Sequence, residues 1–516
     1  MCSAFTQLTP IFRATRLMRI LFLAASLSAF LSGSFAQKTT KINLIKADSM
    51  VFRKAWGPDL RRVIGNVVFE HAGALLYCDS AYFFETTNNV NAFGRIHIKV
   101  SDTLDIFGDK LDYDGNTKLA NLIGNAKMVD RQTVLSTDRL SFDRNTGIAF
   151  YDNHANIISE ENKLSSLRGY YNTNSKEFFF KDHVLLTNPK YIIKSDTMLY
   201  NTLSRVSFFK GPTRIIGKDN IIYCENGWYN TENDKSQFSK NAWLQYKEQK
   251  LSGDSLYYDR NSGIGKAFHH ITLVDTAKQV VLHGNHADFY ELQGHSMITD
   301  SAEAILFSSK DTLYLHADTL HGTFDSLKNF KVLNAYHKVR FYRHDLQGIC
   351  DSLLYSFLDS TVSMRRTPVI WSGENQIFAD SIRIWMTRQE ADSMLLYNTS
   401  FIISKVREKK YNQIKGKNMT GFFHKNDLYK LKVLSNAESL YFVDEDNGKP
   451  IGVNYASSSE LEIYIKDKKV QRIKYIGKPQ GSMKPENFVK APDLILRGFE
   501  WKEESRPKDR FDIFRN

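Results

Sequence analysis

A period of 29 residues, kept without a slip over seven repeats, constrains this chain more than any other feature. An aromatic residue recurs at that spacing, and each one is followed by a polar residue. The aromatic positions are Phe84, Tyr113, Phe142, Tyr171, Tyr200, Tyr229 and Tyr258. A fixed period of this length marks repeat architectures, in which each structural unit stacks on the next. Such a stack builds a long continuous surface or groove, so the sequence predicts a protein that binds, spans or scaffolds.

Other columns keep the same phase. An apolar residue lies seven positions before each aromatic. Two positions after that apolar residue, a small residue followed by an acid is common; the acids include Asp109, Asp138, Asp196 and Asp254. A further column is rich in glycine and polar residues: Gly65, Gly94, Gly124, Asn153, Asp182, Gly211, Lys240 and His269. We expect the acids to accept backbone N–H bonds at a corner of each repeat. Calcium held between the layers is the alternative.

Alternating apolar and polar side chains identify the local structure as strand. After Gly94 the chain reads RIHIKV, which gives an extended strand one apolar face and one polar face. Turn-forming runs such as DGNTK (114–118) and DRNTG (143–147) separate these segments. We therefore predict an all-β chain: an elongated β-solenoid or open, twisted β-jelly-roll of stacked ~29-residue repeats. Each repeat should hold two or three short strands, with a corner at the small-acidic pair.

Two alternate positions in the strand after the glycine column are apolar in repeat after repeat. Side chains two apart on a strand point to one face, so these residues share one apolar interior. If the sheet edges stay apart, that interior is a dry groove; if they close, the same side chains form a filled core. The residues predicted to line the groove are Val67, Phe69, Ile96, Ile98, Met128, Ile157, Val184, Leu186, Ile215, Leu244, Ile271 and Leu273.

The first residues are typical of an exported protein. Three arginines precede the apolar run 20–31, and small residues end at Ala36. This pattern predicts a cleaved signal peptide over residues 1–36, with Met18 as an alternative start. A membrane anchor is the competing interpretation, although the apolar run is short for a span.

Beyond that segment, the regular repeats cover 37–300, and a divergent continuation with insertions covers 301–480. A basic tail with several prolines follows over 481–516. Proline and charge argue against further strands there. We expect the tail either to dock on a partner or to stay disordered.

Composition and motifs exclude several classes of function. Cys78, Cys224 and Cys350 lie several repeats apart, too far for the ~6 Å Cα separation of a disulfide, so we expect buried thiols. No CxxC, HExxH, GxSxG or Walker motif occurs, and we predict no catalytic residue, metal or cofactor. His283 and His286 form an HxxH, but in a turn-like HGNH. The net charge of +12 favours an anionic glycolipid or membrane surface, and no nucleic-acid motif is present.

Four runs repeat a common pattern of glycine, strand, polar strand and turn: GNVVFEHAGALLYCDSAYFFE (65–85), FGDKLDYD (107–114), LIGNAKMVD (122–130) and LSGDSLYYD (251–259). In the order and spacing of these runs, the chain resembles the OstA-like (organic-solvent-tolerance) family of lipopolysaccharide-transport proteins. The resemblance is good over 45–300 and looser to about 480. It implies an open jelly-roll whose apolar interior shields the acyl chains of lipid A while lipopolysaccharide crosses the periplasm to the outer membrane.

The resemblance also implies partners and a location. Lipopolysaccharide or lipid A would be the cargo, and the protein would work in the periplasm in association with the outer membrane. Other jelly-roll transport proteins, or an outer-membrane barrel, would join at the open strand edges, and the chain would also associate end to end. Its length suggests an elongated bridge, or a variant of the barrel partner's periplasmic domain.

Two other functions remain open on the residues alone. One is an exported structural or adhesive solenoid that carries no lipid. The other is a carbohydrate-active β-solenoid enzyme, in which two carboxylates face each other across a groove. The acids of this chain recur in layer after layer, which favours a structural role for them.

Overall fold

The computed structural model describes residues 40–308, 311–327, 329–387, 390–445, 449–467 and 469–515. The signal peptide predicted over 1–36 lies outside the described residues. Within those ranges, no helix is both long enough and apolar enough to cross a bilayer.

The described residues divide into two compact units. Unit 1 takes its residues from 1–128 and 141–145, and unit 2 takes its residues from 129–140 and 146–516. The strands of unit 1 are β1 (Asn43–Lys46), β2 (Ser49–Val51), β3 (Leu60–His71), β4 (Ala74–Phe84), β5 (Asn89–Lys99) and β6 (Leu104–Asp114). Two strands contribute residues to both units: β7 (Leu119–Asp130) and β8 (Thr133–Asp143).

Unit 2 consists almost entirely of further strands. They are β9 (Ile148–Tyr151), β10 (Ala155–Ser159), β11 (Asn162–Ser166), β12 (Arg168–Asn172), β13 (Glu177–Asn188), β14 (Tyr191–Asn201), β15 (Val206–Ile216), β16 (Asn220–Asn230), β17 (Lys235–Tyr246), β18 (Gln249–Asp259), β19 (Ile264–Asp275), β20 (Val280–Tyr290), β21 (His295–Thr299), β22 (Glu303–Phe307), β23 (Thr312–His316), β24 (Thr319–Phe324), β25 (Phe330–Arg343), β26 (Leu346–Ser356), β27 (Thr361–Arg365), β28 (Val369–Ser372), β29 (Asn375–Phe378), β30 (Ser381–Thr387), β31 (Glu390–Arg407), β32 (Lys410–His424), β33 (Asp427–Asp444), β34 (Pro450–Lys466), β35 (Lys469–Ile476) and β36 (Gln480–Lys484).

The helical elements of the described residues are single 3-10 turns: η2 (Lys54–Trp56) in unit 1, and η3 (Glu486–Phe488), η4 (Ala491–Leu494), η5 (Glu503–Ser505) and η6 (Asp512–Phe514) in unit 2. The all-β prediction is therefore confirmed.

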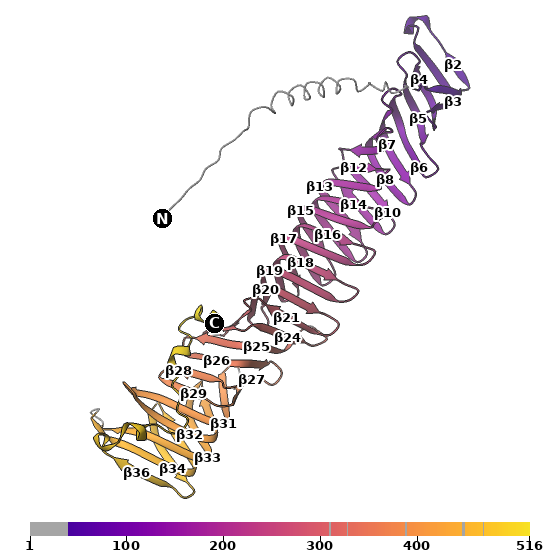
Figure 1. Cartoon of the computed structure of the whole chain (residues 1–516). Coiled ribbons are helices and arrows are strands. Elements are labelled where there is room, and N and C mark those ends of the chain that lie inside the picture. Colours follow the sequence, from indigo (N-terminus) through magenta and orange to yellow (C-terminus); the bar gives the residue numbers. More distant parts are fainter. Residues whose placement is uncertain are drawn as a thin grey trace, which may run out of the picture. The chain divides into compact units, whose positions relative to one another are not determined.

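A 29-residue repeat corresponds to two antiparallel strands, one out and one back. From β13 to β20 each strand pairs with the next one along the chain, so that the strands follow one another layer by layer within unit 2 (Figure 1). Because every layer uses the same register, residues 29 apart fall at equivalent places. This is the stacking that the period predicts.

Each repeat bends at one corner. In β13 the corner residues Asp182 and His183 both have positive φ, 61° and 54°, and the pairing with β14 shifts register there. The glycine-rich column of the sequence is the first residue of these corners. At Gly65, φ is +80° and an added Cβ would collide with the side chain of Asp48, so both the backbone conformation and the close contact favour glycine at this corner. The buried side chains of β13 lie on one side before and after the corner: Phe178, Phe180, Val184 and Leu186.

The acids next to the corners accept hydrogen bonds from side chains of corner residues, where we had expected backbone N–H donors. Asn125 donates through Nδ2 to Asp109 Oδ2 at 2.8 Å, and His270 Nδ1 lies 2.9 Å from Asp254 Oδ2. His269 and His270 both have positive φ, which places them in the corner as predicted. The acids thus join one layer to the next.

The turns after the aromatic column are built by their polar first residue. Asp114 Oδ1 accepts the backbone N–H of Asn116 at 2.8 Å, and Asn172 Oδ1 accepts that of Asn174 at 2.9 Å. Asn174 also donates through Nδ2 to the Thr146 carbonyl of the previous layer at 2.9 Å. The Asn and Asp residues after the aromatics therefore shape each turn and tie it to its neighbour.

The cysteines are buried and unbridged, as predicted. Cys78, Cys224 and Cys350 are free thiols inside the strands. Burial raises the pKa of the Cys78 thiol and of the Cys224 thiol to about 12, so both stay protonated at neutral pH.

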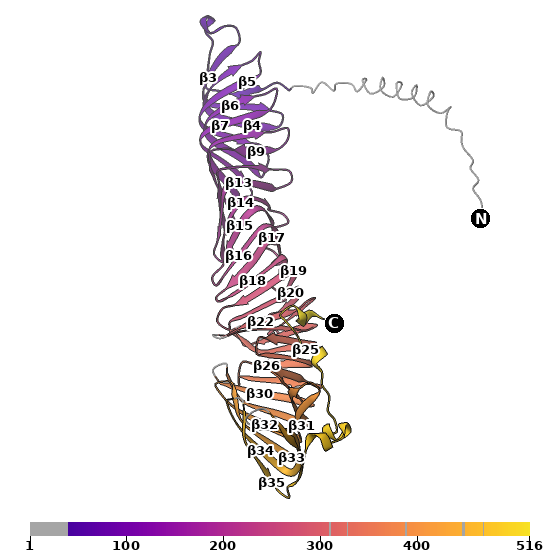
Figure 2. The same ribbon diagram turned by 90° about the vertical axis from the view of Figure 1, so that its left-hand side faces the viewer.

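Residues 485–515, which we call the C-terminal strap, run back along the outer face of unit 2 (Figures 1 and 2, yellow). Strap residue Leu496 completes a cluster with outward-facing side chains of β31, β33 and β34, and Phe499 and Trp501 pack against it. Further along the strap, Ile513 is fully buried and the Phe514 ring lies 4.6 Å from that of His316. The strap packs on its own chain, which was not among the arrangements expected for the tail.

Three buried glutamines hold the strap. Gln413 donates through Nε2 to the Leu494 carbonyl and accepts the N–H of Leu496, both at 2.8 Å. Gln376 bonds the Glu500 carbonyl and the Lys502 N–H in the same way, at 2.6 and 2.7 Å. Gln347 accepts from Arg506 Nε at 2.9 Å. Because these amides recognise mainly backbone groups, sequence patterns gave no sign of them.

Candidate functional site

Each layer ends in two rows of turns. The aromatic turns, such as 173–176 and 202–205, follow the aromatic column; the opposite turns, such as 189–190 and 217–219, lie at the other ends of the strands. Because every repeat bends at its corner, the two rows approach each other. Tyr171, which precedes an aromatic turn, donates to Asp130 Oδ2, which precedes an opposite turn, at 2.7 Å. We call the gap between the two rows the mouth.

The twelve predicted groove residues all lie on the inner face but differ in exposure. Nine are at most 4% exposed: Val67, Phe69, Ile96, Ile98, Met128, Ile157, Val184, Leu186 and Ile271. The other three, Ile215, Leu244 and Leu273, are half-buried. Nine of the twelve positions are therefore packed in a filled core, and the other three mark a stretch that is open.

That stretch is an apolar trough in unit 2, with a cavity volume of about 480 Å³, between Lys190 and Phe324. Ile215, Leu244 and Leu273 line it, and two more aliphatic residues complete their row. These side chains are cross-strand neighbours in the order Ile215, Ile222, Leu244, Leu251 and Leu273. The facing wall comes from the half-strands beside the aromatic turns and includes Phe238, Leu256, Phe289 and Ile298.

The same row is closed on both sides of the trough. Upstream it continues through Ile193 and Leu186, which are 1% and 2% exposed. Downstream it reaches Leu282, which is also 2% exposed, and then the large buried cluster that extends to Ile463. The trough is thus bounded within unit 2.

Two sequence columns contribute to the space, although a small residue alone does not open a layer, since Ala149 of the first column is 0% exposed. On the wall beside the aromatic turns, bulky side chains give way to small ones at the 29-residue spacing. One column reads Phe178, Ser207, Ser236 and Gly265, and the other reads Phe180, Phe209, Phe238 and Ala267. A Cβ added at Gly265 would meet Phe289 and Tyr258 only at ordinary contact distances, from 3.4 Å. These columns were readable in the sequence, but their effect depends on which face they share.

The mouth of the trough is polar. The Tyr229 hydroxyl donates to Asp234 Oδ1 at 2.5 Å, and the Tyr258 hydroxyl donates to Glu291. Burial, and then these hydrogen bonds, raise the pKa of both tyrosines, so they stay neutral at physiological pH. The rim also carries the cationic side chains of Lys190, Lys218 and Arg260 from turns, and that of Lys266 from β19.

Upstream, in the first layers of unit 2, a buried polar clasp closes the mouth. Asp130 is 4% exposed and accepts hydrogen bonds from Tyr171 and from Lys176 Nζ, the latter at 2.5 Å. Behind it, the Tyr171 ring stacks on Phe178 at 4.1 Å between centroids. At the trough, by contrast, the hydroxyls of Tyr229 and Tyr258 bond to acids of their own row, and the two rows meet there through a ring contact of Tyr229 with Tyr191, at 5.8 Å between centroids.

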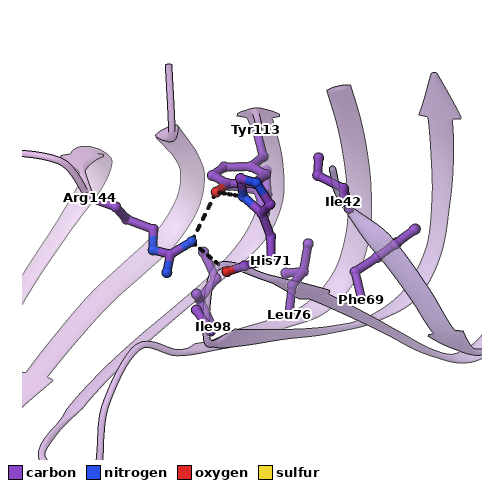
Figure 3. Close-up of a pocket in the computed structure, with 9 residues that line it drawn as sticks. Ile42, Phe69, His71, Leu76, Ile98, Tyr113 and Arg144 are labelled. Carbon is purple, nitrogen blue, oxygen red and sulfur yellow. Dashed lines mark hydrogen bonds between the residues drawn. The ribbon is translucent and has the colours of Figure 1, made fainter. Parts of the chain in front are cut away.

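Unit 1 has a clasp of its own (Figure 3). His71 Nδ1 lies 2.6 Å from the Tyr113 hydroxyl, and Arg144 donates to that hydroxyl and to the His71 carbonyl, each at 3.0 Å. Ile42 inserts beside them and is 5% exposed. The remaining cavity is about 20 Å³, room for one water molecule. Burial lowers the pKa of His71, so the imidazole is held neutral.

The described ranges offer little other chemistry. No group of three or more His, Cys, Asp or Glu side chains there is placed to hold a metal ion. The two histidines of the HxxH make separate contacts: His283 with Thr272 at 3.1 Å, and His286 with Asp288 at 3.0 Å. The trough is therefore the candidate functional site.

Comparison with known proteins relates the first part of the chain to a family. Residues 39–196 match the family described as OstA-like protein, which confirms the resemblance. A solved structure that matches is LptH of Pseudomonas aeruginosa, described as the LptA-homologous periplasmic component of the conserved lipopolysaccharide transport device. It is 13% identical, covers 23% of this chain and 83% of its own, and has a TM-score of 0.20. A search of curated proteins found no match. Most of the trough lies beyond the residues that match the family.

Proposed function

From the OstA-like match over residues 39–196 and the trough that follows it, we propose that this protein carries lipopolysaccharide in the periplasm. In this role the acyl chains of lipid A lie in the apolar interior while the polar part of the molecule stays outside the mouth. Shielding an acyl chain from water contributes about 0.8 kcal/mol per methylene group, which makes an apolar trough sufficient as a binding device. The proposal includes no catalytic step.

The half-buried row of aliphatic side chains carries the proposal. Ile215, Leu244 and Leu273 face a cavity of about 480 Å³, whereas a core residue of a folded protein is normally packed on all sides. An unfilled apolar space with one polar rim suits an amphiphile. The rim carries acidic side chains such as Asp219 and Glu291 as well as cations such as Lys218, and these polar groups suit the polar part of an amphiphile.

Export and partners belong to the same proposal. The segment over 1–36 would direct the chain to the periplasm, where it would work beside the outer membrane. Among the described residues, β35 and β36 pair only with β34, and β1 and β2 pair only with β3. Such edges accept a further strand, so a jelly-roll partner or a second copy would extend the stack there.

Lipid analysis of a matched pair of variants tests the proposal. We expect the wild-type protein, isolated from the periplasm, to carry lipopolysaccharide detectable by mass spectrometry. Leu244→Asp should lose most of it, because a carboxylate in the trough opposes an acyl chain. The control is Gln245→Asp, which places the same charge on the exposed outer face of β17. Equal lipid in both variants, or no lipid in the wild type, would contradict the proposal and favour a structural solenoid.

A further inference from the structure

The interior of unit 2 changes character twice along one row of side chains. Leu186 and Ile193 are packed, the five residues from Ile215 to Leu273 are half-buried, and Leu282 is packed again. A track along which an acyl chain slides would need every layer to be open. The structure has an open length between two closed ones.

The layers upstream of the trough are closed by polar and aromatic groups together. Asp130 is buried with Tyr171 and Lys176 as its partners, and Phe178 stacks on both Tyr171 and Phe180, at 4.1 and 5.4 Å. Admitting a chain here would separate a buried carboxylate from its partners and displace packed rings. The first change is unfavourable because it leaves a buried carboxylate without compensation. The second is unfavourable because it disrupts packed rings.

The downstream end is closed by apolar packing. Ile298 is 4% exposed and forms the trough's last wall together with Phe324. The Phe324 ring packs on Phe330 at 4.6 Å, and Phe330 lies 6.1 Å from Phe357. These rings fill the interior beyond the trough.

We propose that the trough is a discrete chamber for the apolar chain of an amphiphile, which enters sideways through the mouth between Ile215 and Ile298. It is not one stretch of a continuous track through the whole stack. The inference rests on the proposed function, because it takes the ligand class from it. It adds where the chain binds, how it enters, and which layers it does not occupy.

Photolabelling of the wild-type protein tests the inference without disturbing the core. The probe is palmitate with a diazirine in mid-chain, and labelled residues are mapped by mass spectrometry. We expect label on Ile222, Leu244, Leu251 and Leu273, and little on Ile157 or Leu186. Label of equal density at Ile157 and Leu186 would overturn the chamber but leave the lipid-carrier function standing. Absence of label throughout the interior would overturn both.

A chamber-filling variant provides the second measurement. Gly265→Phe restores at the trough the bulk that Phe178 has in the closed layer, and should reduce palmitate labelling by about tenfold or more. Gln237→Phe adds the same ring to the exposed outer face of β17 and should leave labelling unchanged. Circular dichroism confirms that both variants are folded. Undiminished labelling in folded Gly265→Phe would overturn the chamber.

Discussion

The layers of unit 2 at 146–205 and those at 206–300 are built from the same repeat, with the same corner and the same cross-strand row of aliphatic side chains. In the first stretch the row is fully packed, and in the second it faces open space from Ile215 to Leu273. Residues opposite the row contribute to this difference, because Phe178 is replaced by Ser207, Ser236 and Gly265 in successive layers.

The mouth also differs between the two stretches, and it is closed by a hydrogen bond between the two rows of turns in the first. At Tyr171 the aromatic column reaches across and bonds Asp130 in the opposite row, whereas at Tyr229 and Tyr258 the hydroxyl bonds an acid in its own row. One repeat therefore supports either a closed or an open layer, depending on a few side chains. A stacked fold allows this because each layer contacts only its neighbours.

The largest expected effect comes from truncating one row at two places. Leu186→Ala should destabilise the layers around β13 and β14 by about 2–5 kcal/mol, because it leaves a cavity in a packed core. Leu244→Ala, in the same row at the trough, should cost about 1 kcal/mol, since that side chain is half-exposed already. Hydrogen exchange of the strand amides reports each local free energy of opening. Equal losses would mean that the trough is filled in solution.

The clasp should produce the next largest effect. Asp130→Ala removes the acceptor of Tyr171 and Lys176 and leaves two buried polar groups unpaired, which should cost about 2–3 kcal/mol. Asp138→Ala changes an exposed carboxylate in β8 and should cost less than about 0.5 kcal/mol. The same exchange measurement reads both. If the two variants are equally stable, the clasp does not close the mouth.

Filling the trough should change stability least among the core variants. Gly265→Leu adds apolar volume where the cavity has room, and its expected effect is within about 1 kcal/mol of zero. The matched change in a packed layer, Ala149→Leu, puts the same side chain where the exposed fraction is already 0%. That overpacking should destabilise the neighbouring strands by about 1–3 kcal/mol. Similar costs at the two positions would contradict an open trough.

The sequence predicted the parts of this fold that depend on period. Equivalent positions recur because stacking imposes one register on every layer, so the corners at Gly65 and His269, the turns after the aromatics and the inner face could all be inferred. Whether Ile215 is packed could not be inferred, because its packing depends on the bulk of the side chains that face it, which lie elsewhere in the sequence. Contacts made once were also missed: Gln376 binds the strap across more than a hundred residues, and no periodic pattern marks it.

The smallest expected effect is a pH dependence of stability that is confined to the unit 1 clasp. It distinguishes this clasp, which contains a histidine, from the carboxylate clasp of unit 2. Burial lowers the pKa of His71, and the charges of Arg144 and Lys118 add to it, while the hydrogen bond to the Thr40 backbone and the charge of Glu70 oppose the shift. The unfolded chain therefore binds a proton that the folded chain does not, once the pH falls below the unfolded pKa of about 6.5. Stability contributed by neutral His71 is present above that pH and declines as the pH falls toward the lowered folded pKa. Hydrogen exchange of β3 and β4, compared between pH 7.5 and 5.5, should show this decline in the wild type and in Tyr113→Phe, which keeps the imidazole buried. His71→Gln should lose the slope; a slope that persists in His71→Gln would assign the titration to another group.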